Sequence, residues 1–158
     1  MRHTQDIICD HSLVLVITRE RDMSRVAVVG GGAGGAAAVV ELVAAGHEVR
    51  FWSRAAQTLA PFKAQGGVAY DGVFGSGLAQ PQLMTSDLVA AIEAAEVILV
   101  CLPTFAHRSV ALALAHAGSS TPVVLNPGHT GGALEFRHTF RSLGSALDRK
   151  STRLNSSH

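Results

Sequence analysis

The 158-residue chain has little of what marks several classes of protein. It contains two cysteines, Cys9 and Cys101, whose separation fits neither a metal site nor a redox motif. The formal net charge is only +1, so nothing favours a nucleic acid or an anionic membrane as a partner. No apolar run reaches the ~18 residues that would span a bilayer. Such sparse cysteine usage makes a reducing cytoplasm the expected location.

Hydrophobic residues make up 47% of the chain and charged residues 16%, which suits one globular domain. Residues 1–22 are expected to be a non-native or disordered extension, although Leu13–Ile17 could instead form an edge strand. Residues 148–158 resemble a translated sequencing adapter and are set aside. The expected dinucleotide-binding domain therefore covers residues 23–147, and the chain is expected to be a fragment of a longer protein.

The clearest motif is a glycine-rich turn between a predicted strand and a predicted helix. Val26–Val29 is a short apolar run typical of a buried strand, and Ala36–Ala45 is a helical segment. Between them, Gly30, Gly32 and Gly35 have the G-x-G-x-x-G spacing. In that context the first glycine permits a tight turn, the second admits a pyrophosphate and the third lets the helix pack closely on the sheet. The motif predicts a nucleotide site at the start of the helix.

The choice between NAD and NADP depends on the end of the next predicted strand, Val49–Trp52. NAD-binding domains usually place an acidic residue there, about 20 residues after the glycines, to bind the ribose 2′-hydroxyl. Here that position holds Ser53 and Arg54. A guanidinium and a hydroxyl can instead bind a 2′-phosphate, so we expect NADP in preference to NAD. Arg54 could alternatively stack on the adenine or point to solvent.

The rest of the chain continues the alternation of strands and helices. The strands are expected at Val97–Leu102 and Val123–Leu125, and the helices at Leu88–Ala95, Phe105–Ala117 and 132–143. Asp71-Gly72 lies between short apolar pairs, which predicts a hairpin. Cys101 is expected to be buried in its strand. This order predicts the α/β class, with a Rossmann-type, doubly wound and mostly parallel sheet.

The helix starts also carry capping signals. Ser86 and Asp87 can cap the helix that begins at Leu88, and Thr104 can cap the helix that begins at Phe105. Pro103 would end the strand before that second helix, because proline lacks the N–H that a sheet requires.

Three stretches of sequence, GGGAGGAAAVVELVAAGHEVRFWSR (30–54), VILVCLPTFAHRSVA (97–111) and VVLNPGHTGGALEF (123–136), together resemble the N-terminal NAD(P)-binding domain of the octopine/nopaline (opine) dehydrogenases. The third stretch discriminates best, because its string is not generic to dinucleotide-binding folds. The resemblance implies an oxidoreductase that condenses an amino acid with a 2-oxo acid and reduces the imine with hydride from NAD(P)H. It places the proton-transfer groups in a second, mostly helical domain, so the catalytic residues are not identified here.

The resemblance also implies which residues of this domain contact the cofactor. The pyrophosphate would be held by Gly30, Gly32, Ala33, Gly34 and Gly35, and the adenosine ribose by Ser53 and Arg54. The cofactor crevice would be lined by Leu102, Pro103, Thr104 and Phe105. The nicotinamide would lie near Asn126, Pro127, Gly128, His129 and Thr130.

Two histidines invite an acid–base role, but simpler roles are expected for both. His107 is predicted to bond to a loop from the first turn of its helix, and His129 to be a solvated or cofactor-contacting loop residue. No cysteine and histidine cluster has zinc-ligand spacing, so no metal is expected.

The alternative functions are a glycerol-3-phosphate dehydrogenase-like or ketopantoate reductase-like enzyme and a non-catalytic nucleotide-sensing module. The sequence carries no signal for the oligomeric state.

Overall fold

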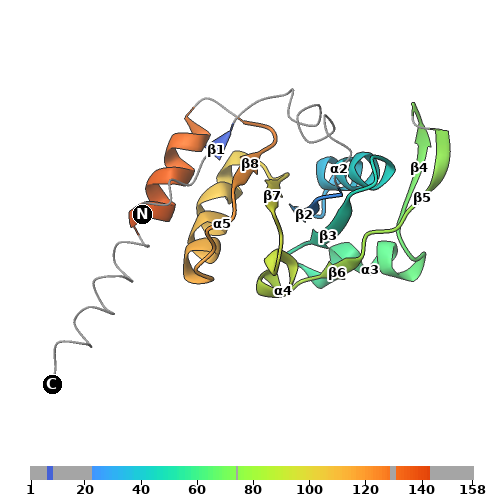
Figure 1. The fold of residues 1–158 in the computed structure, drawn as a ribbon, viewed down its shortest axis with the longest axis horizontal. Helices are drawn as coiled ribbons and strands as arrows, with labels where there is room; N and C mark the ends of the chain where they lie inside the picture. The colour runs from blue at the N-terminus through green and yellow to red at the C-terminus, as the bar shows by residue number, and fades with distance from the viewer. Residues whose placement is uncertain (1–6, 9–22, 74, 129–130, 143–158) are drawn as a thin grey trace, which may run out of the picture.

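The computed structural model describes residues 7–8, 23–73, 75–128 and 131–142 (Figure 1). Six parallel strands form the main sheet, in the order β1-β8-β7-β2-β3-β6. They are β1 (Ile7–Ile8), β2 (Arg25–Val29), β3 (Glu48–Trp52), β6 (Leu83–Thr85), β7 (Val97–Val100) and β8 (Val123–Leu125). The predicted class, a Rossmann-type doubly wound sheet, is confirmed.

Helices connect these strands and cover both faces of the sheet. They are α2 (Ala33–Ala44), α3 (Ala56–Ala64), α4 (Leu88–Ile92), α5 (Thr104–His116) and a last helix described over residues 132–142. A separate antiparallel pair, β4 (Val68–Gly72) and β5 (Gly75–Ala79), lies beside α2 (Figure 1).

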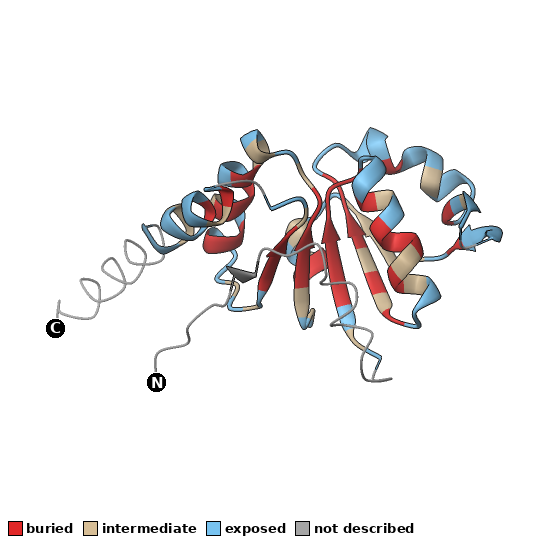
Figure 2. Ribbon diagram, turned by 90° about the horizontal axis from the view of Figure 1, so that it is seen from above, coloured by how far each residue is buried: buried red, intermediate tan, exposed pale blue. Residues whose placement is uncertain are grey.

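The central strand β2 has the sequence RVAVV, and its last four residues are fully buried. Val26 and Val28 pack on the face covered by α2 and α3, whereas Ala27 and Val29 pack on the face covered by α4, α5 and the helix 132–142. Figure 2 shows the buried strands between these two helical layers. A continuous apolar run is what burial on both faces of a parallel strand requires.

The register brings three strand ends to the same level. Val29 at the end of β2 pairs with Trp52 at the end of β3 and with Val100 at the end of β7. Gly30 then donates its backbone N–H to Trp52 O at 2.9 Å. The residues that follow β2, β3 and β7 therefore converge at the carboxyl edge of the sheet.

Three predicted boundaries differ from the structure by two residues or more, and the first is the start of α2, which lies at Ala33 rather than at Ala36. Strand β7 ends at Val100, so Cys101 follows the strand, although it is buried as expected. The predicted helix Leu88–Ala95 ends at Ile92, because the backbone then leaves the helical region and Ala94 has a φ of 56°. Arg50 stabilises that end by donating to Ala90 O (2.8 Å) and Glu93 O (2.7 Å).

One predicted helix cap is confirmed and another is wrong. Asp87 Oδ1 accepts hydrogen bonds from the backbone N–H groups of Val89 (2.9 Å) and Ala90 (3.3 Å), so Asp87 caps α4 as predicted. Thr104 does not cap α5, because it is already the first helical residue and extended Pro103 occupies the N-cap position.

The structure also tests the predicted hairpin and part of the predicted N-terminal extension. The hairpin is present, but its turn lies between Gly72 and Gly75 rather than at Asp71-Gly72. Within the predicted extension, Ile7–Ile8 forms β1, which pairs with β8 at the edge of the sheet. The segments 13–17 and 148–158 lie outside the described residues.

Candidate functional site

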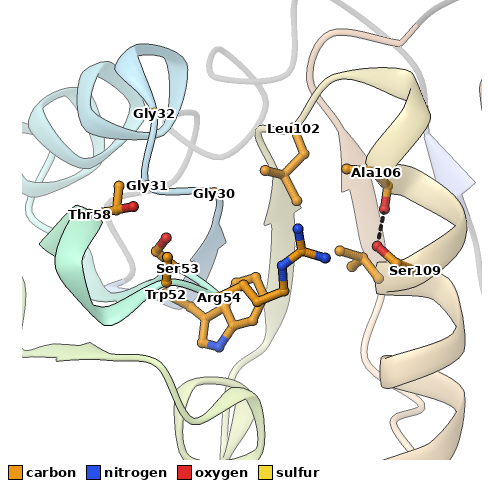
Figure 3. A pocket seen from close by; sticks show the side chains of 12 residues that line it. Gly30, Gly31, Gly32, Trp52, Ser53, Arg54, Thr58, Leu102, Ala106 and Ser109 are labelled. Atoms are coloured by element: carbon orange, nitrogen blue, oxygen red, sulfur yellow. Dashed lines mark hydrogen bonds between the residues drawn. The ribbon is translucent and has the colours of Figure 1, made fainter.

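A cavity of about 260 Å³ opens where β2, β3 and β7 end (Figure 3). Its lining residues come from the glycine loop, the end of β3, the start of α3 and the first turns of α5. They are Gly30, Gly31, Gly32, Trp52, Ser53, Arg54, Ala55, Thr58, Leu102, Ala106, Ser109 and Val110. From here α2 leads to β3 on one side of β2, whereas α5 leads from β7 to β8 on the other. Such a switch point is where open α/β sheets bind ligands.

The first and third glycines of the motif are required by packing. Gly30 has a φ of +135°, and a Cβ atom there would lie 2.5 Å from Cys101 O. A Cβ atom on Gly35 would lie 1.7 Å from Gly30 O, well inside any possible contact. Gly30 therefore allows the turn out of β2, and Gly35 lets α2 pack directly against that turn.

Gly32 faces open space instead. A Cβ atom built there would meet nothing within 4 Å, and the same is true of Gly34. Gly32 is the N-cap of α2, and neither a side-chain cap nor an acidic first-turn residue is present at this helix start. The first N–H groups of a helix have no intrahelical acceptor and carry a positive partial charge. This end of α2 can therefore accept an anionic group that approaches the backbone.

Gly31 lines the cavity, and the sequence reasoning missed it. A Cβ atom on Gly31 would lie 2.7 Å from Ser53 Cβ and 2.8 Å from both Ser53 Oγ and Thr58 Cγ2. A side chain at Gly31 would thus separate the glycine loop from the end of β3 and the start of α3. The signal in the sequence is the unbroken run Gly30-Gly31-Gly32, which has a glycine at a position that the motif leaves open.

Ser53 and Arg54, which are predicted to contact the adenosine ribose, lie in the cavity wall. Ser53 is 6% exposed, and its backbone N–H donates to Thr85 O at 3.3 Å. The Arg54 side chain is exposed and reaches across the cavity toward Leu102 and α5 (Figure 3). None of the described residues that line the cavity is acidic, so nothing there neutralises the guanidinium. The wall therefore suits a phosphate group better than it suits a cation.

The opposite wall is mostly apolar. Leu102 was predicted to line the crevice, whereas Ala106, Ser109 and Val110 further along α5 were missed. These positions follow a helical spacing of three and four residues, so one face of α5 points at the cavity. Trp52 forms part of the floor, with its indole N–H held by Ser86 O at 3.0 Å. Ala55 and Thr58 at the start of α3 complete the set of missed positions.

Several predicted contacts do not line this cavity. Gly35 lies buried below the loop, and Ala33 and Gly34 are exposed on the first turn of α2. Among the residues after β7, Pro103 is exposed, Thr104 is half-buried and Phe105 is 88% exposed. Asn126, Pro127 and Gly128 follow the more distant strand β8, and residues 129–130 lie outside the described part of the chain. A contact between these residues and a nucleotide stays a prediction.

Two reactive residue types near the site are buried. Burial and, to a smaller extent, the negative charge of Glu41 together raise the pKa of the Cys101 thiol to about 12, so the thiol stays protonated at neutral pH. His107 is also buried, and its Nε2 lies 2.9 Å from Leu102 O, which confirms its predicted bond to a loop. Within the described ranges, no three histidine, cysteine or acidic side chains are grouped to hold a metal ion. No described helix combines the length and apolarity needed to cross a bilayer.

Comparison with known proteins confirms the resemblance to opine dehydrogenases. The chain is 38% identical over 120 residues to an opine dehydrogenase from Arthrobacter sp. (strain 1C). The aligned region covers 75% of this chain and 33% of that protein. A structure of octopine dehydrogenase in complex with NADH and agmatine is 25% identical with a TM-score of 0.62, over 78% of this chain and 33% of that one. The chain thus spans about a third of the length of the relatives it matches.

Other relatives share the fold at lower identity. Glycerol-3-phosphate dehydrogenase from Coxiella burnetii is 23% identical with a TM-score of 0.60, over 77% of this chain and 38% of that one. The family described as NADP oxidoreductase, coenzyme F420-dependent, matches residues 25–126, and the chain belongs to this family.

Proposed function

We propose that residues 23–147 form the cofactor-binding domain of an NAD(P)-dependent, opine dehydrogenase-like oxidoreductase. The observation that carries this proposal is the open space in front of Gly32. Gly32 lies at the start of α2, which has no side-chain cap, and it lines the cavity at the switch point of the sheet. A dinucleotide diphosphate fits these features, because it needs close approach to backbone N–H groups and a positive helix end.

The adenosine half would occupy the cavity. Leu102, Ala106 and Val110 offer an apolar wall for the adenine, and Ser53 and Arg54 offer polar groups to the ribose. Because Arg54 has no acidic neighbour in the cavity wall, we favour NADP over NAD, with the guanidinium on the 2′-phosphate. Thr58 lies close to Ser53 across Gly31 and could bond to the same phosphate.

When bound, the nicotinamide nucleotide supplies the hydride for the reaction. The chain's own residues bind and orient it: the glycine loop holds the diphosphate, and the residues after β7 and β8 form the edge toward the nicotinamide. No described residue of the cavity wall is a histidine, aspartate or glutamate. We therefore propose that proton transfer relies on groups in a second domain. The opine dehydrogenase relative is long enough to contain one, because the match covers only 33% of its length.

The substrates are proposed from the similarity to opine dehydrogenase: an amino acid and a 2-oxo acid, joined as an imine that is then reduced. The 38% identity over 120 residues favours this reaction over the alternatives that share the cofactor fold, such as glycerol-3-phosphate dehydrogenase. The 158-residue chain is expected to bind the cofactor and to turn over no substrate.

Calorimetric titration of the chain with NADPH and with NADH tests the proposal. We expect NADPH to bind more tightly, and Arg54→Ala to weaken NADPH by about tenfold while NADH changes less than about twofold. Arg108→Ala is the matched control, since Arg108 is exposed on α5 and does not line the cavity. Absence of binding heat with either nucleotide would refute the cofactor role, and equal losses for both would refute the assignment of the 2′-phosphate to Arg54.

A further inference from the structure

His107 is a buried residue for which cofactor binding, as described above, has no use. The residue is 0% exposed and is the fourth residue of α5. Nε2 lies 2.9 Å from Leu102 O. A carbonyl oxygen can only accept, so Nε2 donates this bond, and in the neutral ring Nδ1 is then an acceptor. His107 thereby holds the backbone of a residue whose side chain lines the cavity.

The second ring nitrogen of His107 is buried without a partner among the described residues. A Cβ atom built on Gly132 would lie 3.5 Å from Nδ1 and 3.8 Å from Thr104 Cγ2. The imidazole also meets the Phe136 ring edge-on, at a centroid distance of 6.3 Å. Nδ1 therefore faces the start of the helix 132–142, the helix that follows the loop after β8.

That helix start has donors to offer. Glu135 N bonds back to Gly131 O at 3.0 Å, so the N–H groups of Gly132, Ala133 and Leu134 precede the first intrahelical bond. An unpaired buried acceptor is unfavourable, and a small movement of this turn toward His107 would satisfy it. The proposed function places the nicotinamide half of the cofactor beside the residues that lead into this turn.

We infer that His107 is a positioning residue that links the two halves of the dinucleotide site. Through Nε2 it fixes Leu102 and with it the wall of the adenosine half. Through Nδ1, once the cofactor is bound, it accepts a hydrogen bond from the first turn of the helix 132–142 and so positions the nicotinamide side. This inference rests on the proposed cofactor function, and it adds a residue that neither the motif nor the cavity wall identifies.

Two substitutions separate the two nitrogens. His107→Gln keeps an amide N–H at about the reach of Nε2 but has nothing in place of Nδ1. His107→Asn places an amide at about the position of Nδ1 but cannot reach Leu102 O. The probes are NADPH and 2′,5′-ADP, which lacks the nicotinamide half. Each variant is titrated with both probes at a temperature where circular dichroism shows it to be folded.

We expect His107→Gln to weaken NADPH by about tenfold and 2′,5′-ADP by less than about twofold. We expect His107→Asn to weaken both probes by a similar factor of about five to ten. General loss of packing would not produce this split, because it would affect both variants alike. Equal effects of the two variants, or no effect of either, would overturn the inference. If wild-type chain binds neither probe, the proposed function itself fails and the inference with it.

A measurement on the wild-type chain covers the case in which a variant does not fold. In ¹⁵N spectra of the histidine rings, the Nδ1 resonance of His107 should move when NADPH binds, as an unpaired acceptor gains a hydrogen bond. It should stay in place when 2′,5′-ADP binds. An Nδ1 resonance that moves with neither probe would contradict the inference even where NADPH binding itself is clear.

Discussion

The glycine loop and the wall formed by α5 face each other across one cavity, but they are built in opposite ways. The loop contributes backbone, and its function depends on side chains that are missing: Gly35 has no room for a methyl group and Gly32 has nothing in front of it. The wall contributes side chains of Leu102, Ala106 and Val110, placed by the packing of α5 on the sheet. Under the proposed function, recognition of a diphosphate would be specified residue by residue along the chain, whereas recognition of the adenosine would depend on how a helix docks.

The largest effect is expected within the loop, at the glycine that contacts the strand end. A Cβ atom on Gly35 would lie 1.7 Å from the backbone oxygen of Gly30, and backbone cannot move aside as a side chain can. We expect Gly35→Ala to lower the free energy of unfolding by about 3 kcal/mol, measured by urea denaturation. Gly34→Ala is the control, because its site is open, and it should stay within about 1 kcal/mol of the wild type. Similar stabilities for the two variants would contradict this view of the loop.

Substitution of Gly32, which faces open space, should show the reverse pattern: loss of nucleotide binding with little loss of stability. Gly32→Val should weaken the nucleotide by about 100-fold, or about 2.7 kcal/mol, because the side chain fills the space for the diphosphate. Its backbone is extended, with φ −77° and ψ −175°, so valine fits, and the stability loss should be about 1 kcal/mol or less.

Emission of Trp52 reports this binding, since it is the single tryptophan of the chain and lines the cavity. Ala37→Val, at an exposed position further along α2, should leave the affinity unchanged. Unaltered nucleotide affinity in Gly32→Val would remove the main support for the proposed function.

On the opposite wall, a comparison of two apolar residues that are close in sequence tests which side chains contact the nucleotide. Leu102 lines the cavity, whereas Phe105 is 88% exposed and does not. Leu102→Ala should weaken 2′,5′-ADP by about fivefold, or about 1 kcal/mol, through lost apolar contact. Phe105→Ser should change it by less than about twofold. A larger loss from Phe105 than from Leu102 would contradict the lining of the cavity described above.

The smallest effect at neutral pH is expected at Cys101, which lies below both regions. Its folded-state pKa of about 12 lies above the ordinary value of 9.0, so the folded chain holds the thiol proton more tightly. This contribution to stability is fully present below pH 9 and is lost as the pH rises toward 12.

The measurement compares unfolding of wild type and Cys101→Ala from pH 7 to alkaline pH. The two free energies of unfolding should run parallel up to about pH 9, and above it the wild type should lose stability faster. Parallel curves throughout would show that the thiol is not buried as described.

The sequence predicted the elements that local patterns encode. The apolar run Val26–Val29 favoured a strand buried on both faces, and the spacing of the glycines after it favoured a turn into a helix. Ser53 and Arg54 followed from counting along that unit. The predicted cap at Thr104 was wrong, because whether a threonine caps a helix or begins it depends on the backbone of Pro103, which the residue type does not fix.

What the sequence alone determined is therefore the class of fold and the backbone of the proposed phosphate site, since both depend on residues near one another in sequence. The tertiary structure decided the rest: that Gly31 must admit Ser53 and Thr58, that one face of α5 closes the cavity, and that His107 lies between the residues after β7 and the helix 132–142. Apart from the bond between His107 and Leu102, which lie five positions apart, these contacts join residues more than 20 positions apart. Their geometry is set by the packing of helices on the sheet, which no local pattern records.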